Sequence, residues 1–424
     1  MDYKVCELKK GVKLHEINVD KFKTNLTAIF FTTDLNRGNV TKNALISLLL
    51  RRGSKNMPSQ EEISKNLEEL YGATFDCGLD KTGDNQVLKF YIETINDKFL
   101  PQNDENMWKV SIEKLLEITL NPYLENNGFK EEYVEQEKQT LKQLIEGIKD
   151  NKARYALERC TQEVHKNDKF GLYKFGYVED LEKLNGKNLY EYYKNIFLKE
   201  CKVDVFASGD INQDITKIIE ETEEFSELNT RDAKYHEIKL ANIEMPKNEE
   251  IIEESMEVTQ GKLVLGLDID IHEEELKYDV MVYNSILGGS ANSKMFQNVR
   301  EKAHLAYVAS SMYLRHKNNI FINCGIEFSN YEKTLKLIRE QLEDMKNGIF
   351  SQEDLIDAKK GIIEAIKTIY DEQDSQITYY FGQELSKNNI KIEEYINKIE
   401  KITRQDVIDI AKLVYINTIY FLKN

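Results

Sequence analysis

An internal duplication is the feature that most constrains how this 424-residue chain can fold. A pattern of one strand, two helices and two strands occurs near the start and again from residue 261. The spacing between the copies is nearly constant, because Gly53 and Gly288 are 235 positions apart and Tyr71 and Tyr307 are 236 apart. Solenoid repeats recur every ~20 to 50 residues, so this longer period indicates a duplicated domain.

Hydrophobic periodicity supports this pattern in the first copy. Residues 25–33 alternate as a strand does, and residues 41–51 carry the apolar stripe of a helix. Ser59 and Glu62 have the spacing of a capping box, which predicts the start of a second helix. The two strands that follow are expected at 74–80 and 86–93.

The second copy repeats this order. Residues 261–271 alternate strictly, with an apolar side chain at every second position. A helix over about 276–287 leads through the small-residue turn 288–292 to another helix that ends near Arg300. The strands that close this copy are expected at 306–314 and 319–328.

The remainder of each half is mainly helical and ends in a strand, at 202–208 and at 417–422. Only 20 glycines and 4 prolines interrupt the chain, which suits long helices. The predicted class is α+β, with two homologous domains that each contain a mainly antiparallel β-sheet covered by α-helices. The predicted boundaries are 1–222 for the first domain, 223–262 for an acidic linker and 263–424 for the second domain.

Composition narrows the class of partner. The chain has 58 basic and 74 acidic residues and a formal net charge of −16, which argues against a nucleic-acid binder, because phosphate recognition needs a concentrated positive face. The N-terminus lacks the apolar run of a signal peptide, and no later segment approaches a membrane span. Five cysteines without C-x-x-C spacing fit a reducing interior. We therefore expect a cytoplasmic protein that binds no membrane.

The residues alone offer no complete catalytic constellation. Six histidines are scattered along the chain, and the closest two, His304 and His316, are 12 positions apart. A local zinc site needs two histidines on one helical face, so none is predicted. Gly288 and Gly289 precede a helix without the Lys-Ser/Thr of a phosphate-binding loop. No serine or cysteine lies in a G-x-S-x-G turn or beside a plausible histidine partner.

Several segments nevertheless carry a resemblance to a known family. Residues 286–311, ILGGSANSKMFQNVREKAHLAYVASS, are similar to the second-domain signature of the pitrilysin and insulinase family of zinc peptidases, which includes mitochondrial processing peptidase. DKFKT at 20–24, LLRRGS at 49–54 and LEELYGA at 67–73 resemble a non-catalytic bacterial branch associated with elongation factor P modification. The resemblance covers essentially the whole chain and implies a processing-peptidase-like fold.

The departure from that family concerns its metal motif. Active members carry an inverted H-x-x-E-H on the first helix of the first domain, just before a Gly-Thr pair. When that pair is placed on Gly53 and Ser54, the motif positions hold residues without a ligand group: Ala44, Ser47 and Leu48. None of the three supplies an imidazole or a carboxylate, so the chain is not expected to hold zinc or to hydrolyse peptides alone.

The position of the family's distal glutamate ligand does not map to a single residue of this sequence. It belongs on the later helix EQEKQTLKQLIEG, where the best placement gives Leu144. A shift along this helix would bring Glu137 or Glu146 close. Which residue replaces the ligand therefore stays open at this point.

A pair in the second domain is retained. In active relatives an Arg and a Tyr seven residues later reach the zinc centre and hold the substrate backbone and the developing oxyanion, and Arg300 and Tyr307 have this spacing. A guanidinium and a phenol supply hydrogen bonds that strengthen as the tetrahedral intermediate forms. Without the surrounding motif, a surface arginine and a packed strand tyrosine would be the better interpretation.

A second candidate for substrate contact is the strand after the first two helices. In the family this strand offers an open edge to which an extended peptide adds by backbone hydrogen bonds. A strand inside the sheet is an equal alternative, because edge status cannot be determined from the sequence. Cys77 is interpreted as a small buried residue rather than a nucleophile. The candidate residues are Thr74, Phe75, Asp76, Cys77 and Gly78.

One leading hypothesis and two alternatives follow. The chain would be the non-catalytic subunit of a heterodimer that binds a peptide and supplies Arg300 and Tyr307 to a homologous zinc peptidase partner carrying H-x-x-E-H. It would hold no cofactor itself, and in isolation it could form a homodimer. The first alternative is a structural or interaction protein of the same fold with no role in proteolysis. The second is an enzyme with a relocated metal site.

Overall fold

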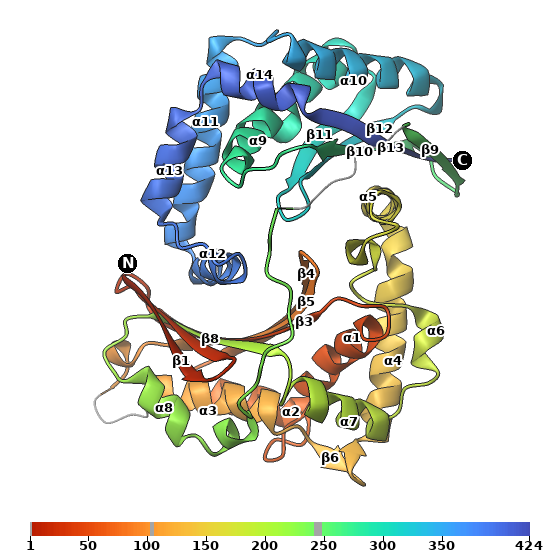
Figure 1. Ribbon diagram of the computed structural model, residues 1–424. Helices are drawn as coiled ribbons and strands as arrows, with labels where there is room; N and C mark the ends of the chain where they lie inside the picture. The colour runs from red at the N-terminus through yellow and green to blue at the C-terminus, as the bar shows by residue number, and fades with distance from the viewer. Residues whose placement is uncertain (1, 102–105, 241–247) are drawn as a thin grey trace. The chain divides into compact units, whose positions relative to one another are not determined.

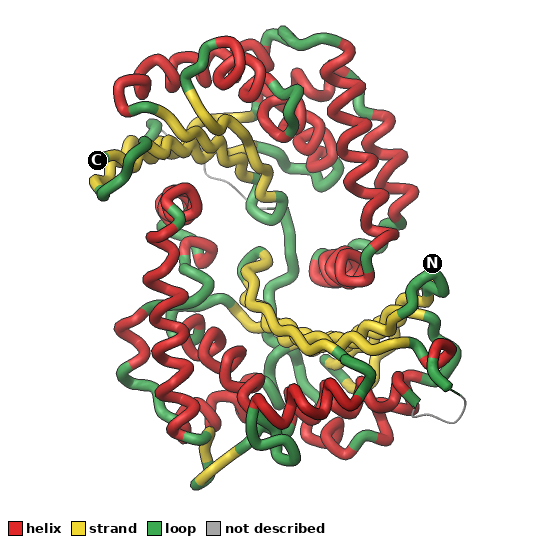
Figure 2. Tube along the Cα trace, turned by 180° about the vertical axis from the view of Figure 1, so that it is seen from behind, coloured by secondary structure: helices red, strands yellow, loops and turns green. Residues whose placement is uncertain are grey.

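The structure, a computed structural model, describes residues 2–101, 106–240 and 248–424. The chain divides into two compact units, and each is discontinuous in sequence (Figure 1; Figure 2). In the described ranges, no helix combines the length and the apolar character that crossing a membrane requires. Unit 1 comprises Met1–Glu146, Leu172–Glu237 and Tyr370–Leu385, and unit 2 comprises Gly147–Gly171, Ile238–Ile369 and Ser386–Asn424.

Unit 1 is built on a six-stranded sheet in the order β1-β2-β8-β3-β5-β4. Neighbouring strands run antiparallel, except that β2 and β8 are parallel. The sheet therefore ends in β1 on one side and in β4 on the other. The strands are β1 (Asp2–Lys9), β2 (Val12–Asn18), β3 (Thr24–Asp34), β4 (Thr74–Thr82), β5 (Asn85–Ile95) and β8 (Lys202–Gly209).

Helices cover both faces of this sheet (Figure 1). One face is covered by helices from the first half of the chain, and Trp108 of α3 is fully buried in the core beneath it. The opposite face is covered by α12 (Gln373–Leu385), which comes from the second half and sets Phe381 against Phe30 with ring centroids 4.9 Å apart. The helices of the first half in unit 1 are α1 (Val40–Leu49), α2 (Gln60–Glu69), α3 (Met107–Leu120), α4 (Glu131–Glu146), α6 (Val178–Leu181), α7 (Gly186–Ile196) and α8 (Ile215–Glu221).

Unit 2 is built on a five-stranded sheet in the order β11-β12-β10-β13-β9. Its strands are antiparallel, except that β13 and β9 are parallel. The strands are β9 (Glu250–Ser255), β10 (Gly261–Ile269), β11 (Ala306–Leu314), β12 (Asn319–Ile326) and β13 (Val414–Lys423). The helices from the second half are α9 (Leu276–Asn284), α10 (Tyr331–Lys346), α11 (Gln352–Lys367), α13 (Ile392–Lys401) and α14 (Arg404–Lys412), with π-helical segments at Ser285–Gly289 and Met295–Lys302.

A helix from the other half of the chain also completes unit 2. Helix α5 (Lys152–Val164) follows α4 in sequence but packs against β10 and β13. Its Cys160 and Tyr155 join a buried cluster with Val264 and Tyr420. Each unit thus takes one helix from the opposite half, which is why the units are not continuous in sequence.

The predicted α+β class with mainly antiparallel sheets is confirmed. The predicted start of α2 is also found, because the Ser59 hydroxyl accepts a hydrogen bond from the Glu62 backbone N–H at 3.2 Å. Strands β1, β2 and β9 were not predicted. β1 and β9 are exposed edge strands rich in charged residues, so the alternation that identifies a strand is weak in them.

The compact units differ from the continuous ranges expected from the sequence. Residues 147–171 lie in unit 2 rather than with 1–222, and residues 370–385 lie in unit 1 rather than with 263–424. The stretch 223–262, expected as a linker, contains β9 and the start of β10. The physical reason is that each sheet has two apolar faces, and a helix from the other half buries the second one.

Two glycines give a matched test of how residues 285–289 pack against β11 in unit 2. Gly288 lies buried in a π-helical segment, and a Cβ there would come within 2.6 Å of the Ser311 backbone nitrogen. Gly361 lies in α11 with no atom within 4 Å of an added Cβ. We expect Gly288→Ala to lower the free energy of unfolding by about 1–3 kcal/mol through overpacking. Gly361→Ala should be neutral or stabilising by about 0.5–1 kcal/mol.

Urea unfolding followed by circular dichroism measures both effects. Equal unfolding midpoints for the two variants would contradict the assigned packing of residues 285–289 against β11.

Candidate functional site

The three positions that correspond to the metal motif lie on α1 and face the interior. Ala44 and Leu48 belong to the apolar core of unit 1, and Ser47 is buried beside them. The Ser47 hydroxyl donates a hydrogen bond to the Ala44 carbonyl oxygen at 2.7 Å, so it is used within its own helix. Ala44 and Leu48 have no ligand atom, and Ser47 has only a neutral hydroxyl in place of the imidazole or carboxylate that zinc binds.

Of the three candidates for the distal ligand position, only Glu137 is buried. It lies on the inner face of α4 and is 2% exposed, whereas Leu144 is 40% exposed. Glu146 is exposed at the end of the same helix, 4.0 Å from Lys142. The structure therefore points to Glu137 as the carboxylate of this helix that faces the interior.

The charges of two arginines that follow α1, Arg51 and Arg52, act on Glu137. Arg52 Nη1 lies 3.4 Å from Glu137 Oε1, and Arg52 Nη2 donates to Gln136 Oε1 at 2.5 Å. Burial raises the pKa of Glu137, and the charges of Arg51 and Arg52 act against this rise. Within the described residues, Glu137 Oε2 and the Nε atoms of Arg51 and Arg52 are buried without a hydrogen-bond partner. Guanidinium groups, rather than metal ligands, accompany this carboxylate.

No cluster suited to a metal ion is present elsewhere in the described chain. Across residues 2–101, 106–240 and 248–424, no three His, Cys, Asp or Glu side chains gather in a way that could hold one. The buried carboxylate Glu137 is accompanied by cations, which repel a metal ion.

The strand with the peptide-contact candidates, β4, lies at the edge of its sheet. The Cys77 backbone N–H is bonded to the Asp76 carboxylate at 2.8 Å, so it points away from β5. Backbone direction alternates along a strand, and the Leu79 carbonyl also points outward, where it accepts a hydrogen bond from Lys174 Nζ at 2.8 Å. Lys174 therefore covers the edge at Leu79. The outward-pointing backbone groups from Phe75 to Cys77 lie before that contact along the strand.

The side chains of β4 alternate between two environments. Phe75 and Cys77 pack against the core of unit 1, whereas Thr74 and Asp76 are exposed on the other face. Burial raises the pKa of the Cys77 thiol, and the nearby Arg51 charge only partly opposes this. The thiol is therefore neutral at neutral pH, as expected for a packing residue rather than a nucleophile.

Arg300 and Tyr307 lie in unit 2, on consecutive elements. Arg300 is on the π-helical segment Met295–Lys302, with its guanidinium 4.7 Å from the Phe296 ring and its Nε 3.4 Å from Glu301. Tyr307 is on edge strand β11 and is 64% exposed. The Tyr307 hydroxyl donates one long hydrogen bond, 3.4 Å, to Glu327. Tyr307 is thus exposed and Arg300 is half-buried, and both side chains are only weakly held.

A β-bulge explains the exposure of Tyr307. Ala306 pairs with Ile326 and Val308 pairs with Gly325, so Tyr307 is the additional residue on β11. Bulges redirect side chains and occur preferentially near active sites. Sequence reasoning identified the residue but not the bulge, because the strand pattern alone does not show the register.

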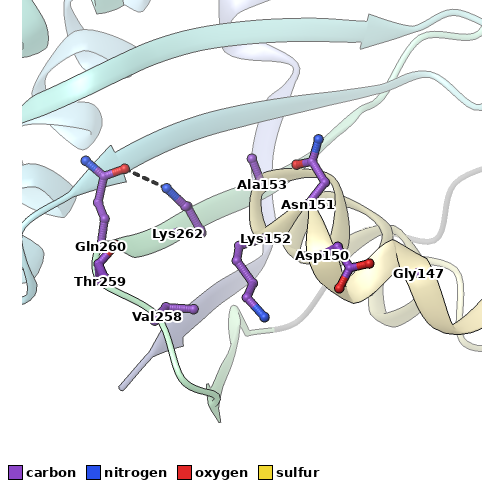
Figure 3. Close-up of a pocket in the computed structure, with 9 residues that line it drawn as sticks. All are labelled: Gly147, Asp150, Asn151, Lys152, Ala153, Val258, Thr259, Gln260 and Lys262. Atoms are coloured by element: carbon purple, nitrogen blue, oxygen red, sulfur yellow. Dashed lines mark hydrogen bonds between the residues drawn. The ribbon is translucent and has the colours of Figure 1, made fainter.

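A pocket in unit 2 was not anticipated from the sequence. Figure 3 shows its lining residues at the start of α5 and around the start of β10. The pocket has a volume of about 590 Å³. Lys262 Nζ donates to Gln260 Oε1 at 2.5 Å, and burial lowers the pKa of Lys262. The pocket contains none of the predicted site residues, and no sequence motif marks it.

Comparison with known proteins places the chain in a family. Residues 183–362 match the family described as Peptidase M16 inactive domain. Over 427 aligned residues the chain is 33% identical to the "Probable inactive metalloprotease YmfF" of Bacillus subtilis, with 99% of this chain and 98% of that protein covered. The chain belongs to the M16 peptidase family, among its inactive members. The resemblance seen in the sequence is confirmed at this level.

Two further comparisons are informative. The chain is 23% identical over 295 residues to the "Uncharacterized zinc protease YmxG" of the same organism, covering 68% of this chain and 70% of that protein. The crystal structure of a conserved protein from Enterococcus faecalis V583 superposes with a TM-score of 0.89 and 28% identity, and the match covers 100% of this chain and 99% of that one. Buried Ala44 and Leu48 provide a physical reason for an inactive member of this peptidase family.

The unusual environment of Glu137 predicts a pH-dependent effect on stability. Because burial raises its folded-state pKa above the ordinary value of 4.5, the folded protein holds the proton more tightly than the unfolded chain does. Ionised Glu137 therefore lowers stability as the pH rises through that folded-state pKa. We expect the free energy of unfolding of Glu137→Gln, relative to the unsubstituted chain, to increase between about pH 4 and pH 7.

The control is Glu135→Gln on the exposed face of the same helix. Its carboxylate pairs with Lys138 at the surface, where such pairs contribute little. Urea unfolding across the pH range measures both variants. A difference for Glu137→Gln that stays flat or decreases with pH would show that the carboxylate is not held in this way.

Proposed function

We propose that this chain is the non-catalytic subunit of a heterodimeric zinc peptidase. It binds an extended peptide and supplies Arg300 and Tyr307 to the active site of a homologous partner that carries H-x-x-E-H. One observation carries the proposal: the metal positions Ala44 and Leu48 are buried in an apolar core, while Tyr307 is exposed and the Arg300 side chain is partly open to solvent.

The chemistry of the two donors fits this role. A guanidinium and a phenol aimed at a scissile carbonyl form hydrogen bonds that strengthen as negative charge develops on the oxygen. The contacts of Arg300 with Glu301 and of Tyr307 with Glu327 are both 3.4 Å long, so little is lost when they exchange for a substrate oxygen. The partner's zinc would supply the activated water.

The relatives support a partner of this kind. Bacillus subtilis has both a relative named "Probable inactive metalloprotease YmfF" and one named "Uncharacterized zinc protease YmxG", and both match this chain. A pair of homologous chains, one with the metal motif and one without it, is what the proposal requires. We accordingly place zinc in the partner and none in this chain, and both chains in the cytoplasm.

Peptide binding is proposed at the edge of β4. The outward-facing backbone from Phe75 to Cys77 lies at the sheet edge, and an added strand would take the Cys77 N–H from the Asp76 carboxylate. This mode of binding selects little for side chains. The resemblance of residues 20–24, 49–54 and 67–73 to the branch associated with elongation factor P modification supports searching for the peptide among proteins of that process.

Co-expression with a homologous zinc peptidase from the same genome tests the role of the donors. We expect the kcat/KM of the complex for peptide cleavage to fall about 10²-fold or more with Arg300→Ala or Tyr307→Phe, because a transition-state hydrogen bond is lost. Lys302→Ala and Tyr415→Phe are matched controls, since both residues are exposed in unit 2 and outside the proposed pair.

The same measurement separates the alternatives. If the partner cleaves equally well alone, or with both donors replaced, the chain is a structural or interaction protein and the proposal is wrong.

Metal content gives an independent prediction. The purified chain should contain far less than one equivalent of zinc after incubation with zinc and gel filtration, because α1 carries no imidazole or carboxylate at positions 44, 47 and 48. Elemental analysis of the chain and of the complex measures this, and the complex should contain about one ion per heterodimer. Stoichiometric zinc in the isolated chain would favour a relocated metal site.

A further inference from the structure

Strand β11 is an uncharged edge of the sheet in unit 2. The two large sheets of the described chain end in four edge strands, β1 and β4 in unit 1 and β11 and β9 in unit 2. β1, β4 and β9 each carry several charged side chains, whereas β11, with the sequence AYVASSMYL, carries none. Charged side chains on an edge strand discourage it from pairing with a further strand. β11 lacks this protection.

The outer side of the β11 backbone is open. Its inner side pairs with β12, from Val308 opposite Gly325 to Leu314 opposite Asn319. Among the described residues, no hydrogen bond from outside this strand pair reaches the backbone of residues 307–313. Because backbone direction alternates along a strand, every second residue of β11 presents outward an N–H and a C=O group that no other described residue takes.

Edge strand β4 shows how such groups are otherwise occupied. There the Asp76 carboxylate accepts the Cys77 backbone N–H at 2.8 Å, and Lys174 donates to the Leu79 carbonyl at 2.8 Å. β11 has no charged side chain that could act in this way, and its Ser311 hydroxyl is bonded to Asn284 instead, at 2.7 Å. The outer backbone of β11 is thus left for another strand.

The exposed side chains of β11 are apolar. Val308 is 52% exposed and Met312 is 45% exposed. Half-buried Ser310 lies between them on the same face, because side chains two positions apart in a strand share a face. Ala309 and Ser311 point to the opposite face and are buried. A strand added to β11 would therefore gain apolar contacts as well as backbone hydrogen bonds.

The lack of charge favours a second copy of this chain as the added strand. When a strand pairs antiparallel with its own copy, a two-fold axis relates the two and the central residue lies opposite itself. With the axis at Ser310, Val308 of each copy lies opposite Met312 of the other, so apolar meets apolar. Self-pairing of acidic β9 is unfavourable, because Glu250 would lie opposite Glu254 of its copy. A different protein would be selected by complementary charge, which β11 does not offer.

We propose that two copies of this chain pair antiparallel through β11, about a two-fold axis at Ser310. The joined sheet runs from β9 of one copy to β9 of the other, and the new backbone hydrogen bonds close both open edges. This inference goes beyond the proposed function, because it assigns a surface for self-association to the isolated chain. Tyr307 immediately precedes the paired residues, so self-pairing and the delivery of Tyr307 to another chain use the same end of β11.

Sedimentation equilibrium of the isolated full-length chain over a range of concentrations tests the proposal. We expect a reversible dimer with twice the mass of the chain. Val308→Lys combined with Met312→Lys places two lysines opposite each other at both ends of the paired strands. Because like charges directly opposite are destabilising and the apolar contacts are lost, the dimer dissociation constant should rise about 10-fold or more.

A charge-reversed double variant is the matched comparison. Val308→Glu combined with Met312→Lys removes the same two apolar side chains but places opposite charges in both cross-strand pairs, so it should dimerise more tightly than the double-lysine variant. Ile251→Lys introduces a charge at a 59% exposed position on the other edge of the same sheet and should leave the dimer unchanged. Circular dichroism of all variants shows whether they are folded.

Three results would overturn the inference. The first is a chain that stays monomeric at every concentration, and the second is a dimer that the double-lysine variant leaves intact. The third is equal weakening in the two folded double variants, which would exclude the pairing of position 308 with position 312. None of these results decides the co-expression test of Arg300 and Tyr307, which measures cleavage by a complex with a homologous partner.

Discussion

Burial of the second face of each sheet is the constraint on which the rest of this structure depends. In unit 1 every residue of β8 is buried, so apolar and polar side chains on both faces must be covered. The first face is covered locally, but the second is covered by α12, whose Phe381 contacts Phe30 and Phe206. Each large apolar side chain buried in this way contributes about 1.5–3 kcal/mol. Neither half of the chain can complete its own sheet, which couples the folding of the two units.

Polar contacts fix where α12 lies. His15 and Asp204 are buried side by side on the sheet, 2.9 Å apart, and Lys202 pairs with Asp204. Burial acts to raise the pKa of Asp204, but the charge of Lys202 and the hydrogen bond from His15 lower it to about 2. Glu384 of α12 joins this group through Lys202 at 3.4 Å. A buried ionic group of this kind contributes more to a single docking position than to net stability.

The sequence was sufficient for the α+β architecture, and it named candidate site residues, but it did not show their environment. Periodicity located the strands whose faces alternate, because burial on one side leaves that pattern in the chain. It missed β9, which is an exposed edge strand, and the exchange of α5 and α12, which depends on pairing between distant segments. The same limit applies to the site. The spacing of Arg300 and Tyr307 was visible, whereas the bulge at Tyr307 depends on the register with β12.

The Arg51, Arg52 and Glu137 group shows which charges accompany the buried carboxylate of α4 in a chain whose α1 lacks the metal motif. In an active relative, the positive charge at this part of the fold would come from zinc, which both attracts oxygen ligands and activates water. In this chain, guanidinium groups supply the positive charge beside the one buried carboxylate of α4. An arginine attracts a carboxylate as strongly as its burial allows, but it has no vacant orbital with which to lower the pKa of water. An arginine at this place can therefore attract an anion, but it cannot activate water for hydrolysis.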